Sequence, residues 1–484
     1  MIDCPADAKL TVKPEIILHT HVQAEHCMEW ECCPEAEVFV PAGTADIALR
    51  SDKFFEDCNT VWPEDRAWDT RGEEKYGIAG AVTERPSEKP LNVKGELIPG
   101  KTFQWQGNNF DIIALPGHNK RAIGILWREQ NVLFSGDLIR KGGYLVNIYD
   151  QERSYGLVSG YSQMRDSLNK VTELSPSLVL PATGPVIDQP EADITALLRR
   201  IDWIREPAGG GEMINFKPLR KFGRWNEVRP GVYQNNNCGN TIVFIDDSGH
   251  GIVIDPDPCI WLNWESSCRS VNRDYDLLEQ KAGLKTLDFQ LITHYHGDHV
   301  QFCKLLKERY NAQIATTPDI AVLLRRNPLP CCLAWYGFPF SELETDIMLE
   351  YDQPFNWNGG AVTPVHTPGH CFAHAGYAME CKNERIVCTG DALMYGTGEI
   401  RANWPIVYND TACPERSTLV TLRKLAAIKP ELILGGHSHA FEDPDGKIIQ
   451  QFIAAYEQAE LKMSEMLHDK DMQRAMTPPG FNKL

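Results

Sequence analysis

The stretch that decides the fold is His294-Tyr295-His296-Gly297-Asp298-His299, which comes just after the apolar run Phe289-Gln290-Leu291-Ile292. Four side chains able to bind a divalent cation therefore fall within six residues at the end of an expected β-strand. Imidazole nitrogens and carboxylate oxygens bind such a cation at about 2 Å, so the backbone that carries them must be rigid. A strand followed by a helix supplies that rigidity, so the pattern predicts a metal site.

Three further segments place His or Asp beside small residues after an apolar run: Thr367-Pro368-Gly369-His370, Thr389-Gly390-Asp391 and Gly435-Gly436-His437-Ser438-His439. In this order the four segments resemble the metallo-β-lactamase superfamily, from about Arg224 to the end of the sequence. The resemblance implies an α/β fold, an αββα four-layer sandwich. An Asp at position 391 is similar to the binuclear branch that includes glyoxalase II, tRNA-processing endonucleases and lactonases. β-Lactamases carry Cys or Ser there, so antibiotic hydrolysis is disfavoured.

The resemblance also implies how two metal ions are held. The first set of ligands is His294, His296 and His370. The second set is Asp298, His299 and His437. Asp391 would bridge the two ions, which we expect to be zinc, with iron and manganese as alternatives.

Three residues near these ligands are candidates for supporting roles. Asp298 would also steer the proton released in the reaction, and is a candidate catalytic residue. His439 is a second candidate: on extended backbone it would point the same way as His437 and could donate a proton, whereas in a tight turn it would not. Asp255 would orient a ligand His through its free ring N–H. The alternative for Asp255 is a turn with Pro256.

The first half of the sequence repeats these landmarks. Residues 115–118 (Leu-Pro-Gly-His) match residues 367–370, and residues 134–137 (Phe-Ser-Gly-Asp) match residues 388–391. From the Asp that ends the second landmark, 46 residues lead to Thr183 in one half and to His437 in the other. Amphipathic helical patterns follow in both halves. The sequence therefore predicts a tandem duplication of the sandwich.

The His motif has a weaker counterpart near the start. Aligning His19-Thr20-His21 with His294-Tyr295-His296 gives a candidate degenerate site with a complete first-metal set: His19, His21, His118 and Asp137. Under that alignment the second-metal set is missing, because its three positions carry Gln23, Ala24 and Thr183. Two interpretations stay open: a single ion bound by three His and one Asp, or a folded relic that supports the active half. His26 could replace a ligand through a local shift, or be a solvated or capping histidine.

The domain boundary is expected near residue 210, where Pro207-Ala208-Gly209-Gly210-Gly211 is typical of a linker. We therefore predict a degenerate domain over residues 1–210 and a complete catalytic domain over residues 211–484. The N-terminal copy is expected to be truncated, because only Ile2-Asp3 precedes its His motif where the other copy has about thirty residues of β-structure. Either the true start lies upstream, or the neighbouring copy covers the exposed sheet edge.

Composition narrows the class of protein. The 484 residues exceed a single ordinary domain, and the formal net charge of −18 disfavours binding to nucleic acid. No apolar run is long enough for a membrane span, and the first residues lack the pattern of a signal peptide. The fifteen cysteines, an odd number, fit a reduced compartment. We expect a cytoplasmic protein, with a homo-oligomer left open.

Specificity is expected from aromatic segments beside the ligands. The most distinctive is residues 328–340, which could wall an apolar pocket or serve core packing. A second candidate wall is Tyr395, Trp404, Tyr408 and Asn409.

The predicted function is a zinc-dependent hydrolase of a small molecule. A metal-bridging hydroxide would cleave an ester, thioester, lactone or related bond. The alternatives are a metal-dependent nuclease or phosphodiesterase, an oxidoreductase resembling persulfide dioxygenases with one iron, and a non-enzymatic binding or scaffold protein with relic sites.

Overall fold

A computed structural model of the chain describes residues 1–4, 10, 12–23, 26–27, 33–50, 68–69, 75–76, 89–146, 159–206, 208–235, 240–256, 264–325, 343–358, 360–371, 373–381, 384–393, 398–402 and 417–467. The chain divides into two compact units. Unit 1 comprises Met1–Glu206 with Lys462 and the residues after it, and unit 2 comprises Pro207–Leu329 and Ala334–Leu461. The aromatic segments 328–340 and Tyr395, Trp404, Tyr408 and Asn409 lie outside the described residues.

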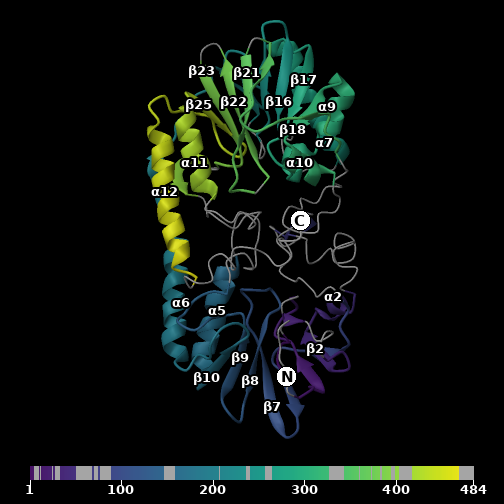
Figure 1. Cartoon of the computed structure of the whole chain (residues 1–484), viewed down its shortest axis with the longest axis vertical. Coiled ribbons are helices and arrows are strands. Elements are labelled where there is room, and N and C mark those ends of the chain that lie inside the picture. Colours follow the sequence, from purple (N-terminus) through teal and green to yellow (C-terminus); the bar gives the residue numbers. More distant parts are fainter. Residues whose placement is uncertain are drawn as a thin grey trace. The chain divides into compact units, whose positions relative to one another are not determined.

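Two sheets form the centre of unit 2 (Figure 1). The first has eight strands in chain order: β12 (Arg220–Phe222), β13 (Trp225–Arg229), β14 (Val232–Asn235), β15 (Ile242–Ile245), β16 (His250–Ile254), β17 (Thr286–Leu291), β18 (Gln313–Thr316) and β19 (Ile347–Met348). The second has six: β20 (Phe355–Trp357), β21 (Gly360–His366), β22 (Ala375–Cys381), β23 (Glu384–Gly390), β25 (Leu432–Gly435) and β26 (Phe441–Glu442).

The apolar cores of unit 2 lie between its layers. Side chains from both sheets, such as Ile252 and Tyr377, share one buried cluster. The other face of the first sheet packs against the helices α7 (Trp264–Ala282) and α9 (Cys303–Tyr310). The other face of the second sheet packs against α11 (Ser417–Ile428) and α12 (Lys447–Ser464). Helix, sheet, sheet and helix make four layers, so the predicted α/β sandwich is confirmed for this unit.

Hydrophobic patterning explains the two kinds of element. All four residues of β15, Ile-Val-Phe-Ile, are buried, because one face of the strand meets the opposite sheet and the other meets a helix. In α12 the expected stripe at helical spacing is buried as well: Ile449, Phe452, Ile453 and Tyr456. Two short helices complete the unit, α8 (Gly297–Val300) and α10 (Pro318–Leu324).

Unit 1 also has two main sheets. The parallel sheet contains β1 (Ile16–Leu18), β2 (Glu37–Pro41) and β5 (Val93–Leu97). The other has the order β10-β9-β8-β7-β6, with β6 (Thr102–Trp105), β7 (Asn108–Ala114), β8 (Ile123–Trp127), β9 (Val132–Gly136) and β10 (Leu178–Pro181). Its helices are α2 (Ala45–Leu49), α5 (Ser159–Leu174) and α6 (Pro190–Arg205), and β3 (Trp68–Asp69) pairs with β4 (Lys75–Tyr76). Leu18 and Ile125 share the cluster that lies between the main sheets.

The second sheets of the two units have the same pairing pattern. In unit 1, β6, β7, β8 and β9 pair antiparallel in turn, and β10 joins β9 in parallel. In unit 2, β20, β21, β22 and β23 pair antiparallel in turn, and β25 joins β23 in parallel. In both, a helix precedes the parallel strand and another follows it: α5 and α6 in unit 1, α11 and α12 in unit 2.

The glycine-rich segment expected to be a linker is instead a strand. β11 (Ala208–Met213) pairs antiparallel with β24 (Glu399–Ala402) inside unit 2. The glycines serve an irregularity in that pairing: Gly209 and Gly210 have φ of +77° and +124°, and the register shifts between Gly209 and Met213. The interpretation of this segment as a linker was wrong, because glycine in a sequence marks a β-bulge as readily as a linker. Among the described helices, none is long and apolar enough to cross a membrane.

Candidate metal centre

The predicted ligands of unit 2 all follow the ends of strands. His294 and His296 come after β17, and Asp298 and His299 lie in the short helix α8. His370 follows β21, Asp391 follows β23 and His437 follows β25. Strands from both sheets therefore deliver side chains to one place.

The first set of ligands converges on one ring nitrogen. His296 Nδ1 lies 2.8 Å from His294 Nε2 and 2.9 Å from His370 Nε2. Ligand atoms of all three residues lie within 4.8 Å of one another. The His294 and His296 side chains are fully buried, and that of His370 is 5% exposed. This is a nitrogen-rich site suited to a borderline cation such as zinc.

The second set forms an adjacent cluster. Asp298 Oδ2 lies 3.3 Å from His437 Nε2 and 3.9 Å from His299 Nε2. These three residues also offer ligand atoms within 4.8 Å of one another.

Asp391 connects the two sets through a single oxygen. Its Oδ2 lies 3.4 Å from His370 Nε2 of the first set. The same oxygen lies 3.2 Å from His437 Nε2 and 3.3 Å from His299 Nε2 of the second. A Cβ at Gly436 would come within 2.2 Å of the other Asp391 oxygen, Oδ1. Glycine is therefore required at position 436 for the carboxylate to occupy this place.

Asp255 holds His299 from outside the cluster. His299 Nδ1 lies 2.9 Å from Asp255 Oδ2, and both side chains are buried. Because an ionised carboxylate only accepts, Nδ1 carries a proton, and Nε2 is the ring nitrogen that faces Asp298 and Asp391. Asp255 thus makes the predicted contact with the outward ring N–H of a candidate ligand histidine.

Thr293 fixes His294 in the same way, and sequence reasoning missed it. Thr293 Oγ1 donates to Asp255 Oδ2 over 2.6 Å, so the hydroxyl must accept from His294 Nδ1, 2.9 Å away. His294 Nε2 is then the unprotonated nitrogen that faces the cluster. The signal was present as a Thr directly before the first His of the motif.

His374 is a further residue whose place the sequence did not indicate. Its ring stacks on His294, with centroids 4.9 Å apart, and its Nε2 accepts from the backbone N–H of Asp391 at 3.3 Å. Its Nδ1 donates to Thr367 Oγ1 at 2.7 Å. His439, by contrast, is exposed and belongs to none of the ligand groups found among the described residues.

The electrostatics favour neutral histidines around an ionised carboxylate. Burial lowers the pKa of His370 to about 4 and holds the pKa of His294 and His296 well below the usual value. Burial alone would raise the pKa of Asp391, but His437, His299 and His370 hold it well below its usual range. His299 differs: burial lowers its pKa, yet three carboxylates, with Asp391 first, raise it well above the usual value.

Buried polar atoms without hydrogen bonds show that these residues fit metal ions. Among the described residues, neither oxygen of Asp298, nor Asp391 Oδ1, nor His299 Nε2 has a hydrogen-bond partner. Leaving such groups unsatisfied costs roughly 1–3 kcal/mol each, and more for charged groups. A divalent cation bound among Asp298, His299 and Asp391 would satisfy atoms of this kind.

A comparison with known protein families finds a match that covers the candidate ligands of unit 2. Residues 236–437 match the metallo-beta-lactamase superfamily, and the match ends at His437. The matched residues that the structure describes lie in unit 2 and include all seven of its candidate ligands.

The curated relatives that match part of the chain are distant. A beta-lactamase-like protein 2 homolog of Drosophila melanogaster is 32% identical over 36% of the chain and 51% of that protein. A hydroxyacylglutathione hydrolase of Acidiphilium cryptum is 28% identical over 32% of the chain and 53% of that protein. The chain thus spans about half the length of these curated relatives. BJP-1, a subclass B3 metallo-beta-lactamase of Bradyrhizobium japonicum, has a TM-score of 0.38 at 16% identity, covering 50% of this chain and 95% of that structure.

Unit 1 has a His and Asp cluster of its own, which contains three of the four predicted residues. His21, His118 and Asp137 offer ligand atoms within 4.8 Å of one another. His19 lies outside this group: its Nδ1 is 3.7 Å from Cys27 Sγ and 3.5 Å from Asp3 Oδ1. His26 joins instead, with Nε2 at 2.9 Å from Asp137 Oδ2.

The correction follows from the register of the motif. Asp3 accepts from Thr20 N at 2.8 Å and from Thr20 Oγ1 at 2.8 Å. Asp255 accepts from Thr293 through the same two groups, at 2.8 and 2.6 Å. Thr20 therefore corresponds to Thr293, two residues from the alignment based on His19. His19-Thr20-His21 has the same His-x-His spacing as His294-Tyr295-His296 but does not occupy the equivalent position.

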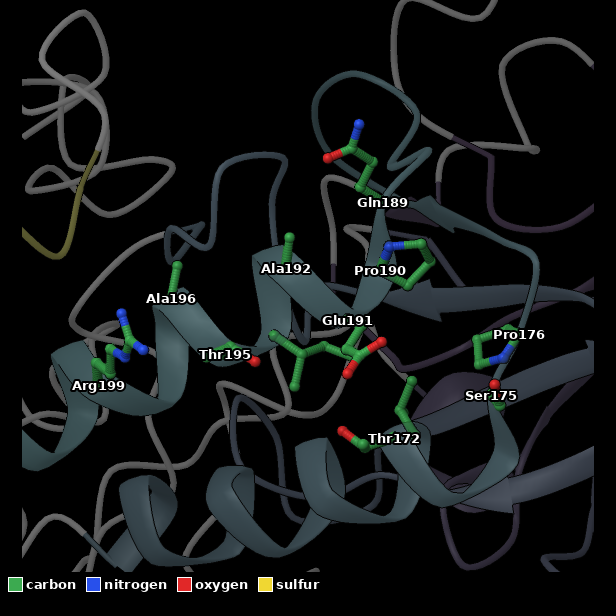
Figure 2. Close-up of a pocket in the computed structure, with 12 residues that line it drawn as sticks. Thr172, Ser175, Pro176, Gln189, Pro190, Glu191, Ala192, Thr195, Ala196 and Arg199 are labelled. Atoms are coloured by element: carbon green, nitrogen blue, oxygen red, sulfur yellow. The ribbon is translucent and has the colours of Figure 1, made fainter.

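A pocket of about 880 Å³ lies elsewhere in unit 1 (Figure 2). The ends of α5 and α6 line it, with Thr172 and Ser175 on one side and Glu191 and Arg199 on the other. None of its lining residues belongs to either His and Asp cluster. The pocket is therefore separate from both clusters.

Proposed function

We propose that unit 2 is a metal-dependent hydrolase that uses two zinc ions to cleave an ester, thioester or lactone bond of a small molecule. The observation that carries this proposal is the position of Asp391, whose Oδ2 lies within 3.4 Å of ring nitrogens from both ligand sets. A carboxylate placed between two sets of ligand atoms suits two cations that share one ligand. Such a pair lowers the pKa of water from ~15.7 to about 7 and polarises the attacked carbonyl, so no Ser or Cys nucleophile is required.

The protein's own groups prepare this site for chemistry. Asp255 turns Nε2 of His299 toward the cluster directly, and Thr293 does so for His294. Asp298 has both oxygens available there, so it would hold one ion and take the proton released when water attacks. Preorganised ligands of this kind need not rearrange as charge develops on the substrate.

A thioester is the first substrate class to test. Two of the relatives bear the name hydroxyacylglutathione hydrolase, and an acyl group on the glutathione sulfur is a thioester. The net charge of −18 supports a small molecule over a nucleic acid, whose phosphates a strongly acidic protein repels. A cytoplasmic location fits the same proposal.

The experiment measures hydrolysis by the zinc-loaded full chain of an S-acylglutathione, a carboxylic ester, a lactone and a single-stranded RNA. We expect turnover of at least one acyl substrate, and a loss of at least ~100-fold in both His296→Gln and His437→Gln, because each removes a ligand. His250→Gln, which alters an exposed histidine paired with Asp288, is the matched control. Undiminished activity in both ligand variants would refute the assignment. Efficient metal-dependent cleavage of RNA alone would replace it with the nuclease alternative.

A further inference from the structure

The corrected register gives the cluster in unit 1 a defined counterpart in unit 2. With Thr20 on Thr293, His21 falls on His294, Gln23 on His296 and His26 on His299. The backbone agrees: His26 N donates to Gln23 O at 2.9 Å, and His299 N donates to His296 O at 3.1 Å.

The strands that carry the other ligands agree as well. Gly117 and Gly369, one residue before His118 and His370, have φ of +145° and +139°. Gly136 and Gly390, one residue before Asp137 and Asp391, have φ of +57° and +49°. The ring pairs are also alike: His21 and His118 meet edge to face at 5.3 Å, and His294 and His370 do so at 4.9 Å.

We propose that unit 1 binds one divalent cation, Zn²⁺ or a similar first-row ion, through His21, His26, His118 and Asp137. This set is a mixture. In unit 2 the equivalents of His21 and His118 belong to the first metal, the equivalent of His26 belongs to the second, and the equivalent of Asp137 lies between them.

The distances fit a single ion. Asp137 Oδ2 lies 2.9 Å from His26 Nε2 and 3.8 Å from both His21 Nε2 and His118 Nε2. In a tetrahedral site with bonds of about 2.0–2.1 Å, neighbouring ligand atoms are ~3.3 Å apart. The separations from Asp137 lie on either side of that value. His21, His118 and Asp137 offer ligand atoms within 4.8 Å of one another, and His26 adjoins this group through Asp137.

Two buried atoms lack the partner that an ion would supply. Thr20 Oγ1 donates to Asp3 Oδ2, so it accepts from His21 Nδ1 at 2.9 Å and leaves His21 Nε2 unprotonated. That nitrogen has no hydrogen-bond partner among the described residues, and neither has Asp137 Oδ1. The His21 and Asp137 side chains are only 1% and 2% exposed, so bulk water does not satisfy them.

One ion rather than two follows from the residues that have changed. Gln23 replaces the imidazole of His296, and its Oε1 lies 3.0 Å from His118 Nε2. Thr183 replaces His437, since Ala182 N donates to Gly136 O as Gly436 N donates to Gly390 O. Neither ligand set of unit 2 is therefore complete in unit 1, whereas the four mixed ligands suffice for one ion.

The test is the metal content of the full chain after loading with Zn²⁺ and extensive dialysis, measured by elemental analysis. We expect Asp137→Asn and His118→Gln each to hold one zinc ion per chain fewer than the wild type. The matched control is His19→Gln, which removes the neighbouring buried histidine that faces Cys27 and should keep the wild-type content. Circular dichroism checks folding. Wild-type content in both ligand variants, or loss of the ion in His19→Gln alone, would overturn the proposal.

A second variant tests the same site by gain rather than loss. Gln23→His restores the imidazole that unit 2 has at this position. We expect the unit 1 ion to become at least ~10-fold harder to remove in a competition with a chromophoric chelator, because the new imidazole offers the ion a further nitrogen ligand. If one of the loss variants fails to fold, this competition decides: unchanged zinc retention in Gln23→His would count against the site.

Discussion

Asp255 and His299 form a buried pair in which Oδ2 accepts from Nδ1 over 2.9 Å, and this contact orients the metal-facing nitrogen of a ligand. His250 and Asp288 form a pair of nearly the same length, 2.8 Å, but at an exposed place away from the ligands. Comparing substitutions in the two pairs therefore distinguishes a specific effect on metal binding from the general effect of losing a His–Asp hydrogen bond.

Replacing Asp255 by Asn should weaken metal binding to unit 2 by about 10- to 100-fold, the usual effect of losing an orienting partner of a ligand histidine. The measurement is a zinc competition titration combined with hydrolysis at saturating zinc. Asp288→Asn breaks the exposed pair and should change neither quantity. Equal effects of the two substitutions would mean that Asp255 acts only on general stability.

Gly436→Ala should expel the Asp391 carboxylate, because the new Cβ would lie 2.2 Å from its Oδ1. We expect loss of at least one zinc ion per chain and of hydrolysis. Gly446→Ala is the control: its φ of +71° brings backbone strain of about 1 kcal/mol, but nothing lies within 4 Å of the added Cβ. Retention of full metal content in Gly436→Ala would contradict the placement of Asp391.

His374→Phe should preserve the ring that stacks on His294 while removing the acceptor for the Asp391 N–H. A buried N–H left without its partner costs roughly 1–3 kcal/mol, so the free energy of unfolding should fall by about that amount in urea denaturation. His366→Phe changes a half-buried ring packed on Tyr351 and serves for comparison. A neutral result for His374→Phe would show that the N–H finds another acceptor.

The family resemblance carried by four sequence motifs predicted the four-layer fold of unit 2 and its seven candidate ligands. Each of these residues follows an apolar strand within a few residues. The role of Asp255 was also predictable, since a carboxylate at the end of β16 lies beside the end of β17 in a parallel pair. Thr293 was not recognised, and His374 was expected only to be structural, because their particular contacts depend on hydrogen bonds that no spacing reveals.

Unit 1 shows why spacing alone can mislead. His19 and His21 reproduce the interval of His294 and His296, yet the bonds from Thr20 to Asp3 place His21 on His294. The second-metal position assigned to Ala24 is in fact occupied by His26. A shift of two residues preserves the side-chain alternation of an extended strand, so hydrophobic periodicity could not detect it.

The central claim is that unit 2 carries out hydrolysis through bound metal, and removing that metal tests it most directly. The full chain is stripped with a chelator until elemental analysis finds no metal, and hydrolysis of the best acyl substrate is measured before and after zinc is restored. We predict that activity falls to background, roughly 100-fold or more below the loaded protein, and returns as zinc refills the two ligand sets. Undiminished hydrolysis by the metal-free chain would contradict the claim.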